Sequence, residues 1–176
     1  MSTRFSIPIL ALAAALYQAP VFAHGGDSPP AGDPPLPPSD LAHLNPRTIL
    51  QLADVVTATA RFQDIEQAFA DGYEDINVVV PHMGHHLMKH DIVDAHFDPE
   101  QPELLVYADD PCGGPMQLVA VEYAVPQDMV KSAPRGFVGD ADVWDKNDDF
   151  GLWTLHAWVW KFNPAGTFAP LNPQVP

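Results

Sequence analysis

The apolar pattern of this chain changes once, from helical spacing to strand-like runs. Apolar residues recur at helical spacing over residues 46–70, between a capping Asn45-Pro46 and a stop at Asp71-Gly72. Four β-prone runs follow, over residues 76–80, 104–107, 116–125 and 153–162. A helical segment followed by successive strands favours an α+β fold, in which a long N-terminal helix packs on an antiparallel sheet, over an alternating βαβ layout. That helix is either continuous or interrupted near residues 57–59.

The turn between the second and third runs predicts a hairpin, because residues 110–115 are rich in Pro and Gly. Strict alternation along the longer hairpin strand places one set of side chains on a common face: Leu118, Ala120, Glu122 and Ala124. In the last run, alternation gives a second such set: Thr154, His156, Trp158, Trp160 and Phe162.

The first 23 residues have the pattern of an export signal. Arg4 gives a positive start, and the apolar stretch from Ile7 to Tyr17 is too short to span a bilayer as a helix. Val21-Phe22-Ala23 fits a small-x-small cleavage site. We therefore predict a signal peptide over residues 1–23 and a periplasmic or secreted protein that does not insert into the membrane after signal removal. The alternative is a buried or anchoring N-terminal helix.

Residues 24–40 predict a disordered tether, because they are rich in Pro, Gly, Ser and Asp. Residues 41–176 are then expected to form a single globular domain. The formal net charge of the chain is −15 at pH 7, which repels phosphates and disfavours a nucleic-acid partner. Such a charge is compatible with cation binding. The alternative is that it only keeps the protein soluble. Cys112 is the one cysteine, so no internal disulfide can form.

Histidines are concentrated in one segment and on one late strand. Five of the eight lie between residues 82 and 96, and another, His156, lies among tryptophans. Imidazole is the commonest protein ligand for transition metals, so the cluster points to a metal held by nitrogen and oxygen. His86 and His90 are four residues apart, which places them on one face of a helical turn. They would also share a face on a strand.

Glu122 is a carboxylate on a strand that otherwise has the composition of a core. Burial there is unfavourable unless the carboxylate is paired or coordinated, and its candidate partners are a cation, His156 or Arg61. If the two strands are neighbours, Glu122 and His156 can face one another. We therefore predict a divalent transition metal site, for zinc, copper, iron or manganese, with four ligands and one in reserve. The four are His86, His90, Glu122 and His156, and the reserve is His85.

Three functions remain open, and the sequence does not decide whether the protein is an enzyme. A site with an open position would suit a metalloenzyme, in which Glu122 is the candidate base if it is not a ligand. A closed site would suit a non-catalytic metal-handling protein. The third is a module that binds a small-molecule ligand in a Trp-lined pocket, with Glu122 and His156 as a buried hydrogen-bonded pair.

The order of four motifs resembles the oil-body-associated proteins of plants and their bacterial and fungal relatives. The motifs are His85-His86-x-x-x-His90, Leu105-Val106-Tyr107, the run from Leu118 to Tyr123, and His156-Ala157-Trp158. The chain is also similar to uncharacterised exported bacterial proteins that share a Met-Gly-x-His turn and a closing Asn-Pro-x-Gly-x-Phe segment, here residues 163–168. The resemblance covers roughly residues 72–172. It implies that the five candidate ligands belong together, and it supplies no reaction.

Two features depart from the plant family. The export signal means that the intracellular location of the plant proteins does not transfer to this chain. The spacing between His86 and Glu122 is also longer here than in the plant proteins.

Overall fold

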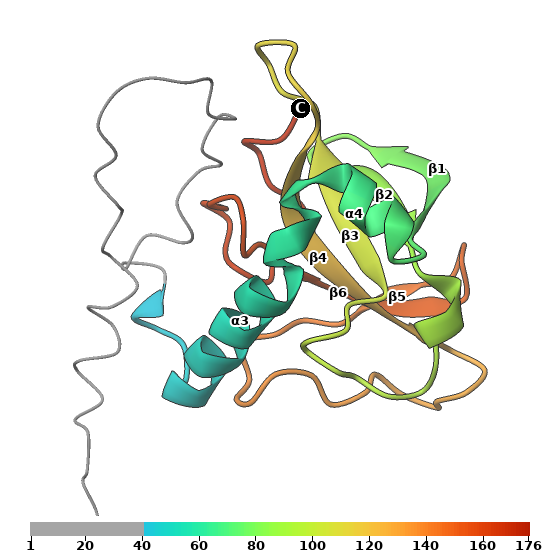
Figure 1. Cartoon of the computed structure of the whole chain (residues 1–176). Helices are drawn as coiled ribbons and strands as arrows, with labels where there is room; N and C mark the ends of the chain where they lie inside the picture. The colour runs from blue at the N-terminus through green and yellow to red at the C-terminus, as the bar shows by residue number, and fades with distance from the viewer. Residues whose placement is uncertain (1–40) are drawn as a thin grey trace, which may run out of the picture. The chain divides into compact units, whose positions relative to one another are not determined.

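A six-stranded antiparallel sheet and a divided helical region make up the part of the chain that the computed structural model describes, residues 41–176 (Figure 1). This agrees with the predicted α+β class. The predicted signal peptide (residues 1–23) and tether (residues 24–40) lie outside the described residues. None of the helices in the described part is long and apolar enough to cross a membrane.

The helical region is not one long helix. It consists of α3 (Pro46–Thr59), a 3-10 turn η1 (Ala60–Gln63) and α4 (Ile65–Ala70). The side chain of Asn45 caps α3 by accepting a hydrogen bond from the Arg47 amide. The interruption falls just after the predicted residues 57–59, because Asp64 adopts an extended conformation and its side chain caps α4. The apolar spacing continues across this break because both helices pack on the same core.

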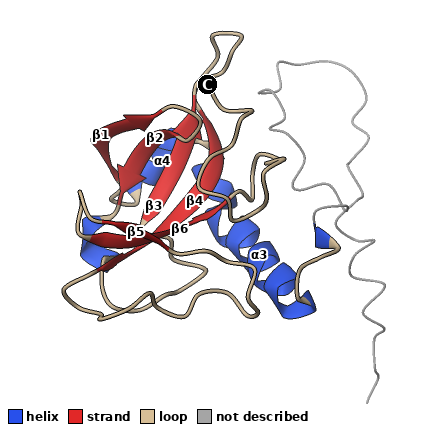
Figure 2. Ribbon diagram, turned by 180° about the vertical axis from the view of Figure 1, so that it is seen from behind, coloured by secondary structure: helices blue, strands red, loops and turns tan. Residues whose placement is uncertain are grey.

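The sheet has the strand order β1-β2-β3-β4-β6-β5, and every neighbouring pair is antiparallel. Its strands are β1 (Glu74–Val80), β2 (Gly84–Met88), β3 (Leu104–Ala108), β4 (Gln117–Pro126), β5 (Asp145–Asn147) and β6 (Leu152–Ala157). The sheet curls, and the helices lie against one of its faces (Figure 2). The hairpin predicted around residues 110–115 is confirmed as the β3–β4 connection.

Two strands were missed by the sequence analysis, and a third is shorter than expected. The histidine segment forms β2, so its residues alternate across a strand and do not wind around a helical turn. Gly84 begins β2 at φ 116°, where an added Cβ would lie 2.2 Å from the Tyr107 carbonyl oxygen. Glycine is therefore required for β2 to approach β3 this closely. The short strand β5 lies between the third and fourth predicted runs, and β6 ends at Ala157, before Trp158.

A bulge in β4 changes the predicted alternation. Val106 pairs with Ala120, whereas the next residue, Tyr107, pairs with Leu118, so Val119 is an extra residue in β4. Leu118 therefore packs with the core cluster on the helix side of the sheet, opposite to the prediction. Ala120 and Glu122 lie beyond the bulge and keep the shared face that alternation gave them.

The two faces of the sheet differ in character. The helix-side face carries the main core, in which the Tyr107 hydroxyl donates a hydrogen bond to the Phe62 carbonyl of η1 at 2.6 Å. The opposite face carries smaller apolar clusters, among them Val106 and Ala120 in one and Leu104 and Ala124 in another. The buried polar side chains of the candidate site lie on this second face.

Glu103 is a buried carboxyl group at the start of β3, and it is 2% exposed. One of its oxygens accepts a hydrogen bond from the Ala124 amide at 3.1 Å. Burial raises the pKa of Glu103 to about 8, and the hydrogen bond from Ala124 offsets this only in part. The protonated form is therefore the one that the fold favours.

This raised pKa predicts a pH-dependent stability. Between the unperturbed pKa of 4.5 and about 8, the folded state binds more protons than the unfolded state. The contribution of Glu103 is therefore complete at low pH and is lost as the pH rises through about 8. We expect Glu103→Gln to gain roughly 2–4 kcal/mol relative to wild type between about pH 5 and about pH 9, measured by urea unfolding. The exposed Glu100→Gln is the control, and an equal gain there would contradict the assignment.

Candidate metal centre

Three strands each contribute one polar side chain to the second face of the sheet: His86 from β2, Glu122 from β4 and His156 from β6. Glu122 and His156 are direct cross-strand partners, so their side chains are neighbours. His86 reaches Glu122 across the intervening strand β3. Flat neighbouring strands are about 4.8 Å apart, so the curl of the sheet helps to bring β2 and β4 side chains together.

The carboxylate of Glu122 lies between the two imidazoles. His86 Nε2 is 3.5 Å from Glu122 Oε2, and His156 Nε2 is 3.5 Å from Glu122 Oε1. One ligand atom from each residue can be chosen so that all three lie within 4.8 Å of one another. Two ligands held about 2.0–2.2 Å from a tetrahedral ion are about 3.3–3.6 Å apart. The two imidazole–carboxylate distances of 3.5 Å match this range, each with a different oxygen of Glu122, and the remaining separations are within 4.8 Å.

All three side chains are buried, with exposed fractions of 3% for His86, 5% for Glu122 and 3% for His156. Burial lowers the pKa of His86, and it lowers the pKa of His156 to about 4. Both imidazoles are therefore neutral near pH 7, which is the form that binds metals. Burial also raises the pKa of Glu122 to about 7, although the nearby His86 and a hydrogen bond from Thr154 lower it in part.

The backbone of β1 sets the orientation of His86. Its Nδ1 lies 3.1 Å from the Val78 carbonyl oxygen, and a carbonyl can only accept a hydrogen bond. Neutral His86 must then carry its proton on Nδ1, which leaves a lone pair on Nε2. That lone pair faces the carboxylate of Glu122. A hydrogen bond from the other ring nitrogen to a carbonyl commonly orients the histidines that bind metals.

His156 has no hydrogen-bond partner for either ring nitrogen among the described residues. Its ring is held by packing, because it stacks on Trp158 at an interplanar angle of 15°. The Trp158 Nε1 is itself tied to the Ala169 carbonyl at 2.7 Å. A buried polar atom without a partner is unfavourable, so a group that bonds to the ring of His156 would be stabilising.

Two predicted ligands do not join this group. His85 is next to His86 on a strand, so it points to the opposite face, where its Nε2 lies 3.5 Å from Asp109 Oδ2. His90 lies in the 3-10 turn η2 (His90–Ile92), beyond the end of β2. Within residues 41–176, the ligand group that the structure assembles contains neither of them.

Other expectations about Glu122 are also corrected. Arg61 is not its partner, because this guanidinium pairs with Asp71 at 2.9 Å. Thr154 was not among the predicted site residues, although its place on the same face as His156 was visible in the alternation of the last strand. The carbonyl of Val78 carries no signal in the sequence.

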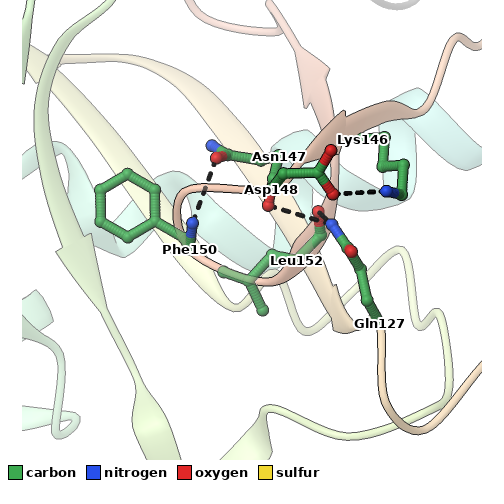
Figure 3. A network of polar contacts seen from close by, with 6 residues as sticks. All are labelled: Gln127, Lys146, Asn147, Asp148, Phe150 and Leu152. Carbon is green, nitrogen blue, oxygen red and sulfur yellow. Dashed lines mark hydrogen bonds and ion pairs between the residues drawn. The ribbon is translucent and has the colours of Figure 1, made fainter.

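A cavity of about 440 Å³ opens over the three side chains. Its walls come mainly from β1 and from the β5–β6 turn, and none of the described residues that line it is a tryptophan. The predicted Trp-lined pocket is therefore wrong for this cavity. Figure 3 shows the β5–β6 turn, where the Gln127 side chain donates to the Asn147 carbonyl at 3.0 Å and to the Leu152 carbonyl at 2.9 Å.

The tautomer assigned to His86 can be measured directly. In metal-free protein at neutral pH, we expect nitrogen chemical shifts from NMR to show His86 protonated on Nδ1 and unprotonated on Nε2, because the Val78 carbonyl accepts the Nδ1 proton. His85 serves as the internal comparison, since it has no such carbonyl partner among residues 41–176 and lies instead near Asp109. A proton on Nε2 of His86 would contradict this geometry.

Comparisons with known proteins give no information about this site. No family model matches the chain, and neither the curated proteins nor the solved structures contain a match. The resemblance to the oil-body-associated proteins therefore stays a prediction.

Proposed function

We propose that the protein binds one divalent transition metal ion through His86 Nε2, His156 Nε2 and a carboxylate oxygen of Glu122. The observation that carries this proposal is the contact of two neutral, buried imidazoles with one buried carboxylate at 3.5 Å. The export signal predicted over residues 1–23 would place this centre in the periplasm or outside the cell.

A simple hydrogen-bonded group explains the geometry less well. Hydrogen bonds between nitrogen and oxygen are usually about 2.7–3.2 Å long, and both contacts here are longer. With the Val78 carbonyl holding the Nδ1 proton, the Nε2 lone pair of His86 faces Glu122, whose ionised form can only accept hydrogen bonds. A cation between them removes this repulsion and also satisfies His156.

The donor set supports several ions. Two imidazoles and one carboxylate occur in catalytic zinc sites and in the facial triads of non-haem iron enzymes, and copper and manganese also accept these ligand types. In those zinc and iron sites the protein supplies three ligands and leaves at least one position open. The proposal therefore covers zinc, iron(II), copper and manganese.

A metal-dependent enzyme is the second candidate function, and the cavity favours it over a closed metal-handling site. The cavity reaches all three candidate ligands, so a small molecule could approach an ion bound there. When bound, the ion would act as a Lewis acid or lower the pKa of a water molecule. Glu122 serves as a ligand in this arrangement, so the proposal does not assign it the role of a base.

Paired histidine variants test the metal site. We expect His86→Ala and His156→Ala each to weaken binding at least about 100-fold, because even the loss of an outer partner of a ligand weakens affinity about 10–100-fold. The matched controls are His85→Ala and His90→Ala, which should stay within about threefold of wild type. Binding is measured calorimetrically on untagged, metal-free protein with each of the four ions.

Circular dichroism and thermal unfolding of the metal-free variants separate loss of a ligand from loss of the fold. If folded His156→Ala binds as tightly as wild type, or if His85→Ala loses as much affinity as His86→Ala, the assigned ligand set is wrong.

A further inference from the structure

The cavity above the candidate metal centre has an apolar wall. Ile76, Val78 and Val80 alternate along β1 as half-buried side chains that line it, whereas Val79 between them is 59% exposed. Leu104 and Leu152 line it from β3 and β6. Half-buried apolar residues around a cavity of this size are typical of a small-molecule site, because a ligand completes their burial.

The rim of the same cavity is acidic. Asp145, Asp148 and Asp149 line it, together with a single ammonium group, Lys146. Lys146 pairs with Asp148, so the rim keeps a negative balance. Asp145 lines the same cavity as Glu122 and His156 on its floor. An anion entering the cavity would be repelled along this path.

The turn that carries these acids is held in place (Figure 3). Gln127 fixes it from outside β5 and β6 through the two bonds to Asn147 and Leu152, and the Phe150 amide donates to Asn147 Oδ1 at 3.4 Å. A rim that is already ordered loses little entropy when a ligand binds. These bonds fix the backbone that carries the acidic side chains at the cavity entrance.

The floor provides the polar contact. His156 is 3% exposed, lines the cavity and has no hydrogen-bond partner for its ring nitrogens among the described residues. A ligand held against the apolar wall would bring its polar end to this floor. Because three protein ligands leave a coordination position open, a neutral nitrogen donor suits an ion bound there.

We propose that this cavity binds a small molecule with an apolar body and one basic nitrogen, of the alkyl-imidazole type, and that it rejects carboxylates of the same size. The apolar wall selects the body and the acidic rim excludes the anion. The preference for nitrogen at the floor rests on the proposed metal function, whereas the other two properties do not.

Three probes of equal size separate these properties. 1-Butylimidazole has the apolar body and the nitrogen donor, 1-butylpyrrole lacks the donor, and heptanoate carries the negative charge. Each is titrated calorimetrically into metal-free and zinc-loaded full-length protein. We expect 1-butylpyrrole to bind metal-free protein at least about tenfold tighter than heptanoate, and 1-butylimidazole to bind zinc-loaded protein at least about tenfold tighter than 1-butylpyrrole.

Matched variants locate the binding. Val78→Ala should weaken 1-butylpyrrole at least about threefold, because it removes apolar surface from the wall, whereas Val79→Ala on the outer face of the same strand should have no effect. The double variant Asp145→Asn/Asp149→Asn should strengthen heptanoate binding at least about threefold, whereas Asp54→Asn on α3 should not.

The outcomes distinguish this inference from the metal proposal. Zinc binding at His86 and His156 without binding of any organic probe would overturn the inference alone. Binding of 1-butylpyrrole that is sensitive to Val78→Ala, without zinc binding, would overturn the metal proposal and retain the apolar cavity. Heptanoate that binds metal-free protein as tightly as 1-butylpyrrole, or equal effects of Val78→Ala and Val79→Ala, would overturn the inference.

Discussion

The contact of one buried carboxylate with two neutral imidazoles is the constraint on which the structure of this site depends. Glu122, His86 and His156 lie on three strands, and burial disfavours the charged form of each. An ionised Glu122 in this position needs a counter-charge. Arg61 does not supply it, because it pairs with Asp71. A divalent cation, as proposed above, would supply that counter-charge and would also use the lone pairs of both imidazoles. The same burial that makes the arrangement unfavourable when empty would make ion binding strong.

The backbone of the sheet positions and orients the side chains that make this contact. Gly84 allows β2 to lie tightly against β3, and the register of the two strands places His86 on the face that holds Glu122 and His156. The Val78 carbonyl then selects the tautomer of His86, and Trp158 supports the ring of His156. The strand β1 thus has two roles, because its backbone orients a candidate ligand and its side chains form the apolar wall of the cavity.

The sequence predicted the site residues that are polar within otherwise apolar strands. Glu122 and His156 stood out because each is polar on a strand of core composition, and their direct pairing agrees with the antiparallel order of β4 and β6. His90 lies outside the group because β2 ends at Met88 and the chain continues into η2, and a spacing of four residues does not reveal where the strand ends. The strand conformation of β2 depends on its distant pairing with β3, and the bulge at Val119 depends on that same pairing. Neither can be recognised from neighbouring residues alone.

Anomalous X-ray diffraction from crystals of metal-loaded protein, recorded at the absorption edge of the bound ion, tests the metal centre most directly. We expect one peak per chain, within about 2.0–2.2 Å of His86 Nε2, His156 Nε2 and a Glu122 oxygen. A peak at the more exposed His85 or His90, or the absence of any peak after loading, would contradict the assigned centre.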